Sequence, residues 1–540
     1  MPTPRAHGGA PLTLIPLNLP GFQGLNKQAD TTLLGPEWAT TLQNAVIDEN
    51  NRLAARKGWV NKTTTALPGP ILVAITFYNT VTSEEEYVVS IDVDTSTTLY
   101  ASNDGGITFR DVTGTANVAD PNMQLLPLNG KLFGIQQGGG AMIMYDGTSF
   151  VDVADVNAPN GPVGLAAYGR LWVVDEDGVT VKYSSLLDGT DWTPVTTPGA
   201  ADPGQISVGN VWAGDDRVTA LVSFNGRLVV FGVHHIIVWE DPQGSELGLN
   251  PLNISVADTL RGIGCVWRDL IQNVQGDLWF VSLQGLHSFS RLIQEKSNPL
   301  ENIAPQMQDY ITSKMSDPGV NLKRARSFYS PLDRFFLLSL PKASIASGSS
   351  TITDYGSTMC FDTRSQLSGG SVRCTGVWDW MVPQAGLLNK VTGELTLAVN
   401  NAPGKLGVYT GYLDDESDYN FDYESGWMDV TKQGYKIIPK RIDSILYIDS
   451  AAAVNFKWFF DFTGTPHSRA VTYPSPGVLA EYNVSEFGIA EYDGGLSLRT
   501  SKVAASGTGE YIKLGCATVV AGSTISIQKL DLFVKVGRLN

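Results

Sequence analysis

A short turn followed by a hydrophobic strand recurs along this chain, and no other feature limits its fold as strongly. The clearest copies share the pattern x-Gly-(Lys/Arg/Asp)-Leu followed by an aromatic residue or Val, and they contain Gly130, Gly169, Gly226 and Gly276. These glycines are 39, 57 and 50 residues apart, close to the repeat of a four-stranded propeller blade, about 40 to 50 residues. The repeat therefore predicts a β-propeller.

Weaker copies extend the series at 331–338 and 392–399, and an earlier strand pair covers 85–100. Together they predict six or seven blades. The 56 Gly and the low charged fraction of 17% also favour short strands joined by tight turns. A stack of separate β-sandwiches is the alternative, although it repeats less naturally. The clearest helix is predicted over 300–315, with Ile303, Met307 and Ile311 on one face.

The pattern changes near residue 426, and this change divides the chain. We predict an all-β protein in which 66–425 form the propeller, with a candidate insertion near 344–373 that lacks clear strands. Residues 426–540 are predicted to form a second, platform-like β domain. The first 65 residues are expected to pack with it, since the ends of a closed ring lie close together.

The formal net charge is −16, which argues against a surface that grips nucleic acid, because such binding depends on Lys and Arg. It does not exclude a duplex that passes nearby, since an acidic lining would let DNA slide. Ordinary solubility of an acidic protein explains the same charge.

No signal peptide or membrane span is apparent, and we expect a soluble protein without membrane insertion. The four cysteines (Cys265, Cys360, Cys374 and Cys516) form no C-x-x-C pair, which favours reduced thiols over a zinc site or disulfides. Of the scattered histidines, His234 and His235 lie within one predicted strand, so their rings should point to opposite faces. We predict no catalytic, cofactor-binding or metal-binding residues and no cofactor.

Three local clusters have both a structural and a functional interpretation. Ser102–Phe109 resembles the Asp-box hairpin of sialidases and other propellers, which is a folding device more often than a catalytic one. Asp414 to Glu424 contains six carboxylates that would either bind a metal, form a solvated loop or line a channel rim. Lys323, Arg324 and Arg326 form a basic patch, predicted to be solvated or to contact an acidic partner subunit.

The order of several motifs resembles one known family, the tail nozzle (tail tubular) proteins of short-tailed bacteriophages. The opening segments Gly21–Gln28, Ala39–Asp48 and Asn51–Trp59 are similar to the start of these proteins. The middle region resembles them at Tyr183–Trp192, Gly214–Phe231, Val238–Gly244, Gly262–Cys265 and Gly276–Leu286. The resemblance covers residues 20–310 well and the C-terminal region only loosely.

This resemblance implies a structural virion protein without enzymatic activity, assembled in the host cytoplasm. It would form a ring, by family resemblance a hexamer, that contacts a tail adaptor and tail fibres or spikes. The ring would retain the genome and then conduct DNA during ejection without reading its sequence. Two alternatives are a propeller-type glycan-active tail enzyme, such as a sialidase or depolymerase, and a monomeric binding scaffold.

Overall fold

A computed structural model describes residues 13–18, 22–93, 98–137, 140–212, 214, 216–244, 249–294, 302–342, 355–367, 369–429, 435–449, 451–474 and 497–538. The chain forms two compact units. The propeller unit contains Asn61–Thr358 and Trp380–Tyr409. The sheet unit contains Met1–Val60, Met359–Asp379 and Thr410–Asn540.

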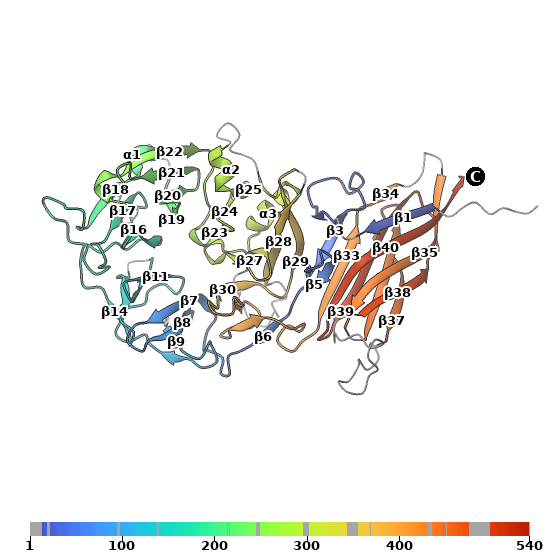
Figure 1. Cartoon of the computed structure of the whole chain (residues 1–540), viewed down its shortest axis with the longest axis horizontal. Helices are drawn as coiled ribbons and strands as arrows, with labels where there is room; N and C mark the ends of the chain where they lie inside the picture. Colours follow the sequence, from blue (N-terminus) through green and yellow to red (C-terminus); the bar gives the residue numbers. More distant parts are fainter. Residues whose placement is uncertain are drawn as a thin grey trace, which may run out of the picture. The chain divides into compact units, whose positions relative to one another are not determined.

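The propeller unit consists, in the described residues, of seven blades of antiparallel strands arranged in a ring (Figure 1). Blade one contains β7 (Ile71–Asn79), β8 (Glu84–Ile91), β9 (Thr98–Ser102) and β10 (Arg110–Asp111). Blade two contains β11 (Gln124–Leu128), β12 (Lys131–Ile135), β13 (Ile143–Tyr145) and β14 (Phe150–Asp152). Blade three contains β15 (Gly164–Ala167), β16 (Arg170–Val174), β17 (Thr180–Tyr183) and β18 (Gly204–Ser207). Blades four and five are β19 (Val218–Phe224), β20 (Arg227–Gly232), β21 (His235–Glu240) and β22 (Ser255–Arg261); β23 (Ile271–Val274), β24 (Asp277–Ser282) and β25 (Gly285–Ser288). Blade six begins with β26 (Arg326–Ser330) and β27 (Phe335–Pro341). Blade seven is β30 (Pro383–Leu388), β31 (Leu395–Val399), β32 (Gly407–Tyr409) and β6 (Trp59–Asn61, in this unit from Asn61). The predicted all-β propeller is confirmed.

The recurring glycine turn connects the first two strands of blades two to five. Its two central residues both have positive φ, for example 49° at Asn225 and 74° at Gly226. Such turns match the right-handed twist of the strands that they join, and glycine adopts this conformation without strain. The turns at Gly130, Gly169 and Gly276 have the same geometry.

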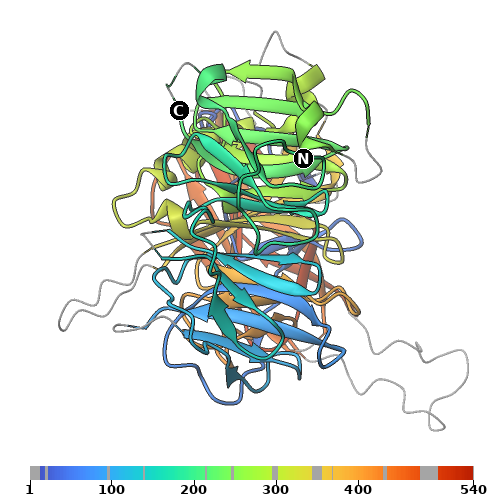
Figure 2. The same cartoon turned by 90° about the vertical axis from the view of Figure 1, so that its left-hand side faces the viewer.

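The last blade is completed by the segment that opens the propeller. The backbone N–H of Lys62 donates to the carbonyl of Leu406 (2.9 Å), and that of Leu67 donates to Gly404 (2.8 Å). Thr63 is buried and its hydroxyl receives the Leu406 N–H at 2.9 Å. The beginning and the end of the propeller chain are thus hydrogen-bonded, which closes the ring. In the perpendicular view of Figure 2, the first blade (blue) and the fourth blade (green) lie at opposite ends of this ring.

The sheet unit contains two sheets that share a core. The first comprises β1 (Thr13–Asn18), β4 (Ala45–Ile47), β5 (Leu53–Ala55), β35 (Tyr435–Ile448), β38 (Ser497–Ala504) and β40 (Ile525–Arg538), in the order β38-β35-β40-β5-β4 with β1 beside β40. The second comprises β2 (Gly24–Leu25), β3 (Trp38–Gln43), β28 (Gly356–Gln366, in this unit from Met359), β29 (Val372–Trp378), β33 (Tyr419–Ser425), β34 (Met428–Asp429), β36 (Ala452–Phe460), β37 (His467–Tyr473) and β39 (Tyr511–Val520). Leu446 and Leu532 from the first sheet and Phe456 and Leu514 from the second are fully buried. The C-terminal region and the N-terminal segment therefore form one β domain.

The predicted domain bounds differ from these units in three places. The propeller begins at Asn61 rather than at 66, because Lys62 and Leu67 hydrogen-bond to its last blade. The propeller ends at Tyr409 rather than at 425, because β33 pairs with β39 of the sheet unit. The candidate insertion near 344–373 lies partly outside the described residues, but 356–366 and 372–378 are strands. From Met359 these strands belong to the sheet unit. Alternation was hard to recognise there because β28 is buried on both faces over 357–363.

Helices are few and short. They are α1 (Gly209–Trp212), α2 (Phe289–Gln294), α3 (Gln308–Met315), η1 (Pro251–Asn253), η2 (Arg268–Leu270), η3 (Pro305–Met307) and η4 (Leu322–Arg324). The helix predicted over 300–315 is α3 preceded by η3, shorter than expected because Pro305 starts a new turn. Its predicted face is buried at Ile303, Met307 and Ile311. Among the described helices, none is long and apolar enough to cross a membrane.

Candidate functional site at the propeller axis

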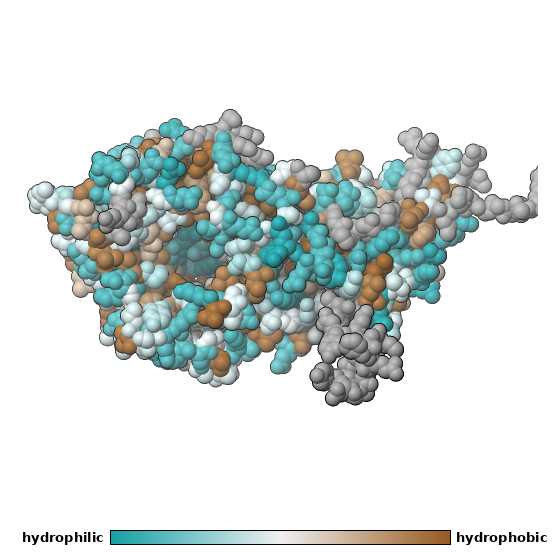
Figure 3. Space-filling model, in the orientation of Figure 1, coloured by the Kyte–Doolittle hydropathy of each residue, from teal (hydrophilic) through white to brown (hydrophobic). Residues whose placement is uncertain are grey.

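The inner strands of the propeller surround a cavity of about 500 Å³. Figure 3 shows a hollow at the centre of the ring with hydrophilic residues inside it. Its wall mixes apolar side chains with the polar side chains of Ser223, Gln272 and Tyr329. A neighbouring hollow of about 330 Å³ shares Leu72 with this wall and is lined mainly by residues of the loops that precede the inner strands.

Arg326 begins β26, and its guanidinium donates hydrogen bonds to groups of its own blade and of two other blades. Its Nη1 donates to the carbonyls of Lys323 and Ala325, each at 3.0 Å, and its Nη2 donates to the carbonyl of Leu72 at 3.2 Å. Nη2 also donates to Asn122 Oδ1. Arg326 is 7% exposed; burial lowers the pKa of its guanidinium, and Asp269 opposes that shift.

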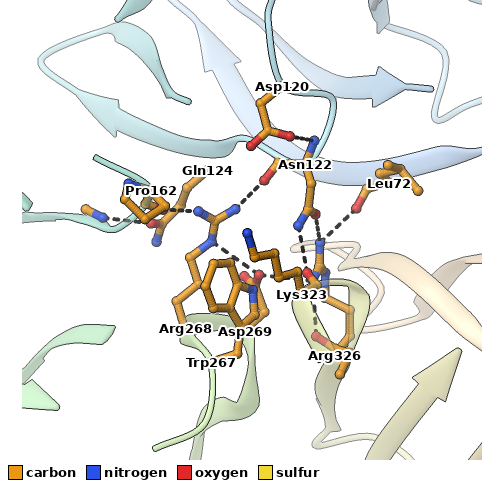
Figure 4. Close-up of polar contacts among 12 residues, drawn as sticks. Leu72, Asp120, Asn122, Gln124, Pro162, Trp267, Arg268, Asp269, Lys323 and Arg326 are labelled. Atoms are coloured by element: carbon orange, nitrogen blue, oxygen red, sulfur yellow. Dashed lines mark hydrogen bonds and ion pairs between the residues drawn. The ribbon is translucent and has the colours of Figure 1, made fainter. Parts of the chain in front are cut away.

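Arg268 and Asp269 complete the arrangement, which is drawn in Figure 4. Asp269 Oδ2 lies 3.3 Å from Arg268 Nε and 3.0 Å from Arg326 Nη1, so one carboxylate is shared by two guanidiniums. The remaining Arg268 nitrogens donate to the carbonyls of Pro162 and Asn122. We call Arg268, Asp269, Arg326 and Asn122 the axial clasp.

The axial clasp connects five of the seven blades. Leu72 belongs to blade one, whereas Asn122 and Pro162 immediately precede the inner strands of blades two and three. Arg268 and Asp269 precede the inner strand of blade five, and Arg326 begins that of blade six. The charged groups of the clasp are therefore used to hold the blades together. This use leaves few guanidinium N–H groups free to bind a ligand.

The basic patch predicted from the sequence is divided by the structure. Lys323 is exposed and its Nζ lies 3.1 Å from Gln137 Oε1, while Arg324 pairs with Asp92 at 2.6 Å. Arg326 is not part of a solvated face, so that interpretation is wrong for it. The reason is geometric: η4 places Arg324 on the rim, and the extended residue Ala325 then directs Arg326 toward the axis.

The acidic stretch from Asp414 to Glu424 is also divided. Asp422 pairs with Lys457 at 2.8 Å and Glu424 with Lys513 at 2.6 Å, whereas Glu416 and Asp418 are exposed. Burial raises the pKa of Asp422, and Lys457 opposes this shift. In the part of the chain that the structure describes, no group of three or more His, Cys, Asp or Glu is placed to hold a metal ion.

Asp414 forms a buried ion pair with Arg56 within the sheet unit. Arg56 Nη1 lies 2.8 Å from Oδ1 and Nη2 lies 2.5 Å from Oδ2, and both side chains are almost completely buried. Asn44 Oδ1 accepts from Arg56 Nε at 3.1 Å, and the Tyr419 ring lies 4.3 Å from the guanidinium. Asp414 is thus a structural residue.

The Asp-box segment is a turn held by its own side chains between β9 and β10. Asp104 accepts from the N–H groups of Ile107 and Thr108 (3.0 Å each) and from the Ser102 hydroxyl (2.7 Å). Slight burial opposes ionisation, but these hydrogen bonds and that of the Thr108 hydroxyl hold the pKa of Asp104 at about 2. The carboxylate is fully used as a turn acceptor.

The histidine pair and the four cysteines that the sequence analysis considered occupy separate places in the structure. His235 Nδ1 lies 3.2 Å from Asp216 Oδ2, whereas His234 is exposed. The prediction that both lie within one strand is wrong, because β21 begins at His235 and His234 lies in the bend before it. All four cysteines are free and buried. Burial raises the pKa of the Cys265 and Cys374 thiols to about 12, which makes their thiolates scarce.

Arg268 and Asp269 were not among the residues that the sequence analysis singled out. They begin η2, which follows Trp267 between two blades and outside every repeat copy, and nothing local distinguishes an arginine there at the axis from one in solvent. The repeat could have located them only in retrospect, because both lie just before the inner strand of a blade.

Comparisons with known proteins identify no relative by sequence. No protein-family model matches the chain, and no curated protein matches it. Among solved structures, a candidate one-component system from B. thetaiotaomicron matches through its extracellular domain, with 10% identity, a TM-score of 0.35, and coverage of 86% of this chain and 61% of that domain.

Two further solved structures cover most of their own length. A KlHsv2 variant with loop 6CD replaced by a Gly-Ser linker has 12% identity and a TM-score of 0.29 over 57% of this chain and 96% of that one. The AfRom2 CNH domain has 10% identity and a TM-score of 0.26 over 69% and 94%. All three scores are too low to indicate a shared function.

Proposed function

We propose that this protein is a structural subunit of a phage tail nozzle, a ring that retains the genome and conducts it during ejection. The ordered motifs over residues 20–310 support this proposal through their resemblance to nozzle proteins. The observation that carries the structural role is the axial clasp, in which the charged groups of the axis connect blades. A nozzle needs stiffness rather than a reactive group, and closed blades with few free edges supply it.

The DNA path in this proposal lies outside the propeller axis. A sphere with the volume of the axial cavity, about 500 Å³, would be about 10 Å across. This is narrower than the major groove of a DNA duplex, which is about 12 Å wide, so the whole duplex would not fit. DNA would instead pass through the centre of a ring of subunits, by family resemblance a hexamer. The acidic balance of the chain would then favour sliding over binding.

A glycan-active enzyme is the second candidate, favoured by the presence of an axial cavity. Most glycoside hydrolases use two carboxyl groups about 5 to 9.5 Å apart. The carboxylates that line the two hollows are Asp269 and Asp120. Asp269 forms ion pairs with the clasp arginines, and Asp120 accepts a hydrogen bond from the backbone N–H of Asn122. The use of both carboxylates as structural acceptors supports the nozzle over the enzyme.

The test is the mass of the purified protein in solution together with negative-stain images, with and without its tail adaptor. Rings or tubes with a central hole are expected. A persistent monomer in the presence of the adaptor would refute the nozzle assignment, and glycan-cleavage assays would then test the second candidate.

A further inference from the structure

The sheet formed by β38, β35, β40 and β1 has one buried face and one outer face. Along β35, Ile437, Ile442 and Leu446 are at most 1% exposed, and along β40, Leu530 and Leu532 are equally buried. Side chains alternate along a strand, and the register of β35 with β40 shifts between Pro439 and Arg441 and between Ile445 and Leu446. On either side of these shifts, the residues that alternate with the buried ones belong to the outer face; Lys440, exposed at the first shift, has no partner in register and is not assigned to it. The register of the strands then identifies every neighbour on that face.

Positive charges dominate this outer face. Five cations, two carboxylates and a set of apolar residues share it. The cations are Lys436, Arg441, Lys502, Lys529 and Lys535, and the carboxylates are Asp443 and Asp531. The face thus has three more positive than negative charges on a chain whose net charge is −16. We call it the basic face.

Two of these cations are neutralised locally and three are not. Arg441 Nε lies 2.6 Å from Asp443 Oδ1, and Lys529 Nζ lies 2.7 Å from Asp531 Oδ2. Within the described residues, Lys436, Lys502 and Lys535 form no ion pair. The unpaired charge therefore resides on three lysines distributed over three strands.

Apolar groups lie between the charges. Leu14 and Leu498 are 47% and 53% exposed and pair with Phe533 and Tyr447 of the same face. The Arg441 guanidinium lies 4.3 Å from the Phe533 ring. Exposed apolar residues surrounded by charges are typical of a surface that binds another protein.

We infer that the basic face is one half of the contact between copies of this chain, and that it docks on an acidic surface of the next copy. The inference rests on the proposed ring. A two-fold contact would place the same face on both partners and bring like charges together, so charge complementarity requires a head-to-tail contact. Closed head-to-tail contacts generate rings.

The size of the face suits such a contact. Strands of 14, 14, 8 and 6 residues, at about 3.3 Å per residue and about 4.8 Å between strands, cover about 670 Å². A standard interface buries about 800 Å² on each partner. A protein partner also fits better than a nucleic acid, because Asp443 and Asp531 would repel phosphates and the apolar residues would gain little from them.

The first experiment combines Lys436→Glu, Lys502→Glu and Lys535→Glu, and measures ring formation by mass photometry at several salt concentrations. The wild-type rings should dissociate as salt rises, and the triple variant should need about tenfold or more protein to assemble. A matched control changes Lys131, Arg261 and Lys390 to Glu, which alters the net charge equally at exposed positions of the propeller unit. The control should assemble like the wild type.

A second measurement does not depend on the folding of a variant. Unlabelled and isotopically labelled wild-type copies are mixed and treated with a zero-length carboxyl-to-amine cross-linker. Mixed-label cross-links from Lys436, Lys502 or Lys535 to carboxylates are expected. If wild-type rings form but show no such cross-links, or if the triple variant assembles normally, the inference fails while the proposed function stands. If the wild type forms no rings even with the adaptor, both fail.

Discussion

Replacement of Arg326 by Met tests whether the axial clasp stabilises the propeller. The change removes the guanidinium that bonds the carbonyls of Leu72, Lys323 and Ala325, and it deprives Asp269 of one of its two cationic partners. Breaking a buried ion pair by removing one partner costs about 3 to 5 kcal/mol. Arg268 still neutralises Asp269, but the carbonyls of Leu72, Lys323 and Ala325 lose their donor, at about 1 to 3 kcal/mol for each buried group left unpaired, so we expect a loss of about 3 to 5 kcal/mol.

The expected change in melting temperature follows from the size of the unit. A propeller unit of roughly 330 residues has an unfolding entropy of about 0.7 kcal/mol/K, so the loss corresponds to about 4 to 7 °C. Differential scanning calorimetry measures the shift, and hydrogen exchange should localise it to β7 and β11. Arg326→Lys, which keeps the charge but not the planar fork of donors, should lie between wild type and Arg326→Met.

The matched control is Arg261→Met, at an exposed arginine of β22. It should change stability by no more than about 0.5 kcal/mol. If Arg326→Met melts within about 1 °C of this control, the clasp contributes little and the argument for an axis used in blade assembly is wrong.

Three further predictions concern other parts of the chain. Asp414→Asn should destabilise the sheet unit by about 3 to 5 kcal/mol because it leaves the buried Arg56 charge uncompensated, and urea denaturation of the sheet unit would show it. Asp104→Asn should lower the free energy of unfolding at neutral pH. Because the pKa of Asp104 is depressed to about 2 in the folded protein, the difference in stability from wild type should fade as pH drops from about 4 to about 2. A stability difference that persists at the lowest pH would contradict the role of the Asp104 carboxylate as a turn acceptor. A thiol reagent should react with none of the four buried cysteines in the native protein and with all of them in denaturant, and rapid labelling of any native thiol would contradict their burial.

The blade turns were predictable because their chemistry is local. A two-residue turn with positive φ at both positions selects Asn-Gly or a similar pair, so Asn129-Gly130 and Asn225-Gly226 are visible in the sequence. The weaker copies at 331–338 and 392–399 lie at the corresponding position of blades six and seven, where longer turns replace the glycine pair.

The clasp and the carboxylate pairings were not predictable because they depend on closure of the ring and on distant strands. Arg326 and Leu72 are brought together only when blade six approaches blade one. Asp422 and Glu424 looked like part of one acidic cluster, but β36 and β39 place Lys457 and Lys513 beside them. The spacing of residues along the chain therefore does not indicate these ion-pair partners.

The distribution of charge connects these observations to the proposed role. The arginines at the axis form ion pairs and hydrogen bonds that connect the blades of one propeller. The unpaired lysines of the basic face would contact the next copy in the proposed ring. If both sets of cations are buried in the assembled ring, the surfaces that remain exposed are more acidic than the isolated chain, whose net charge is already −16. Such a ring would repel the duplex that it conducts, so assembly itself would generate the sliding surface.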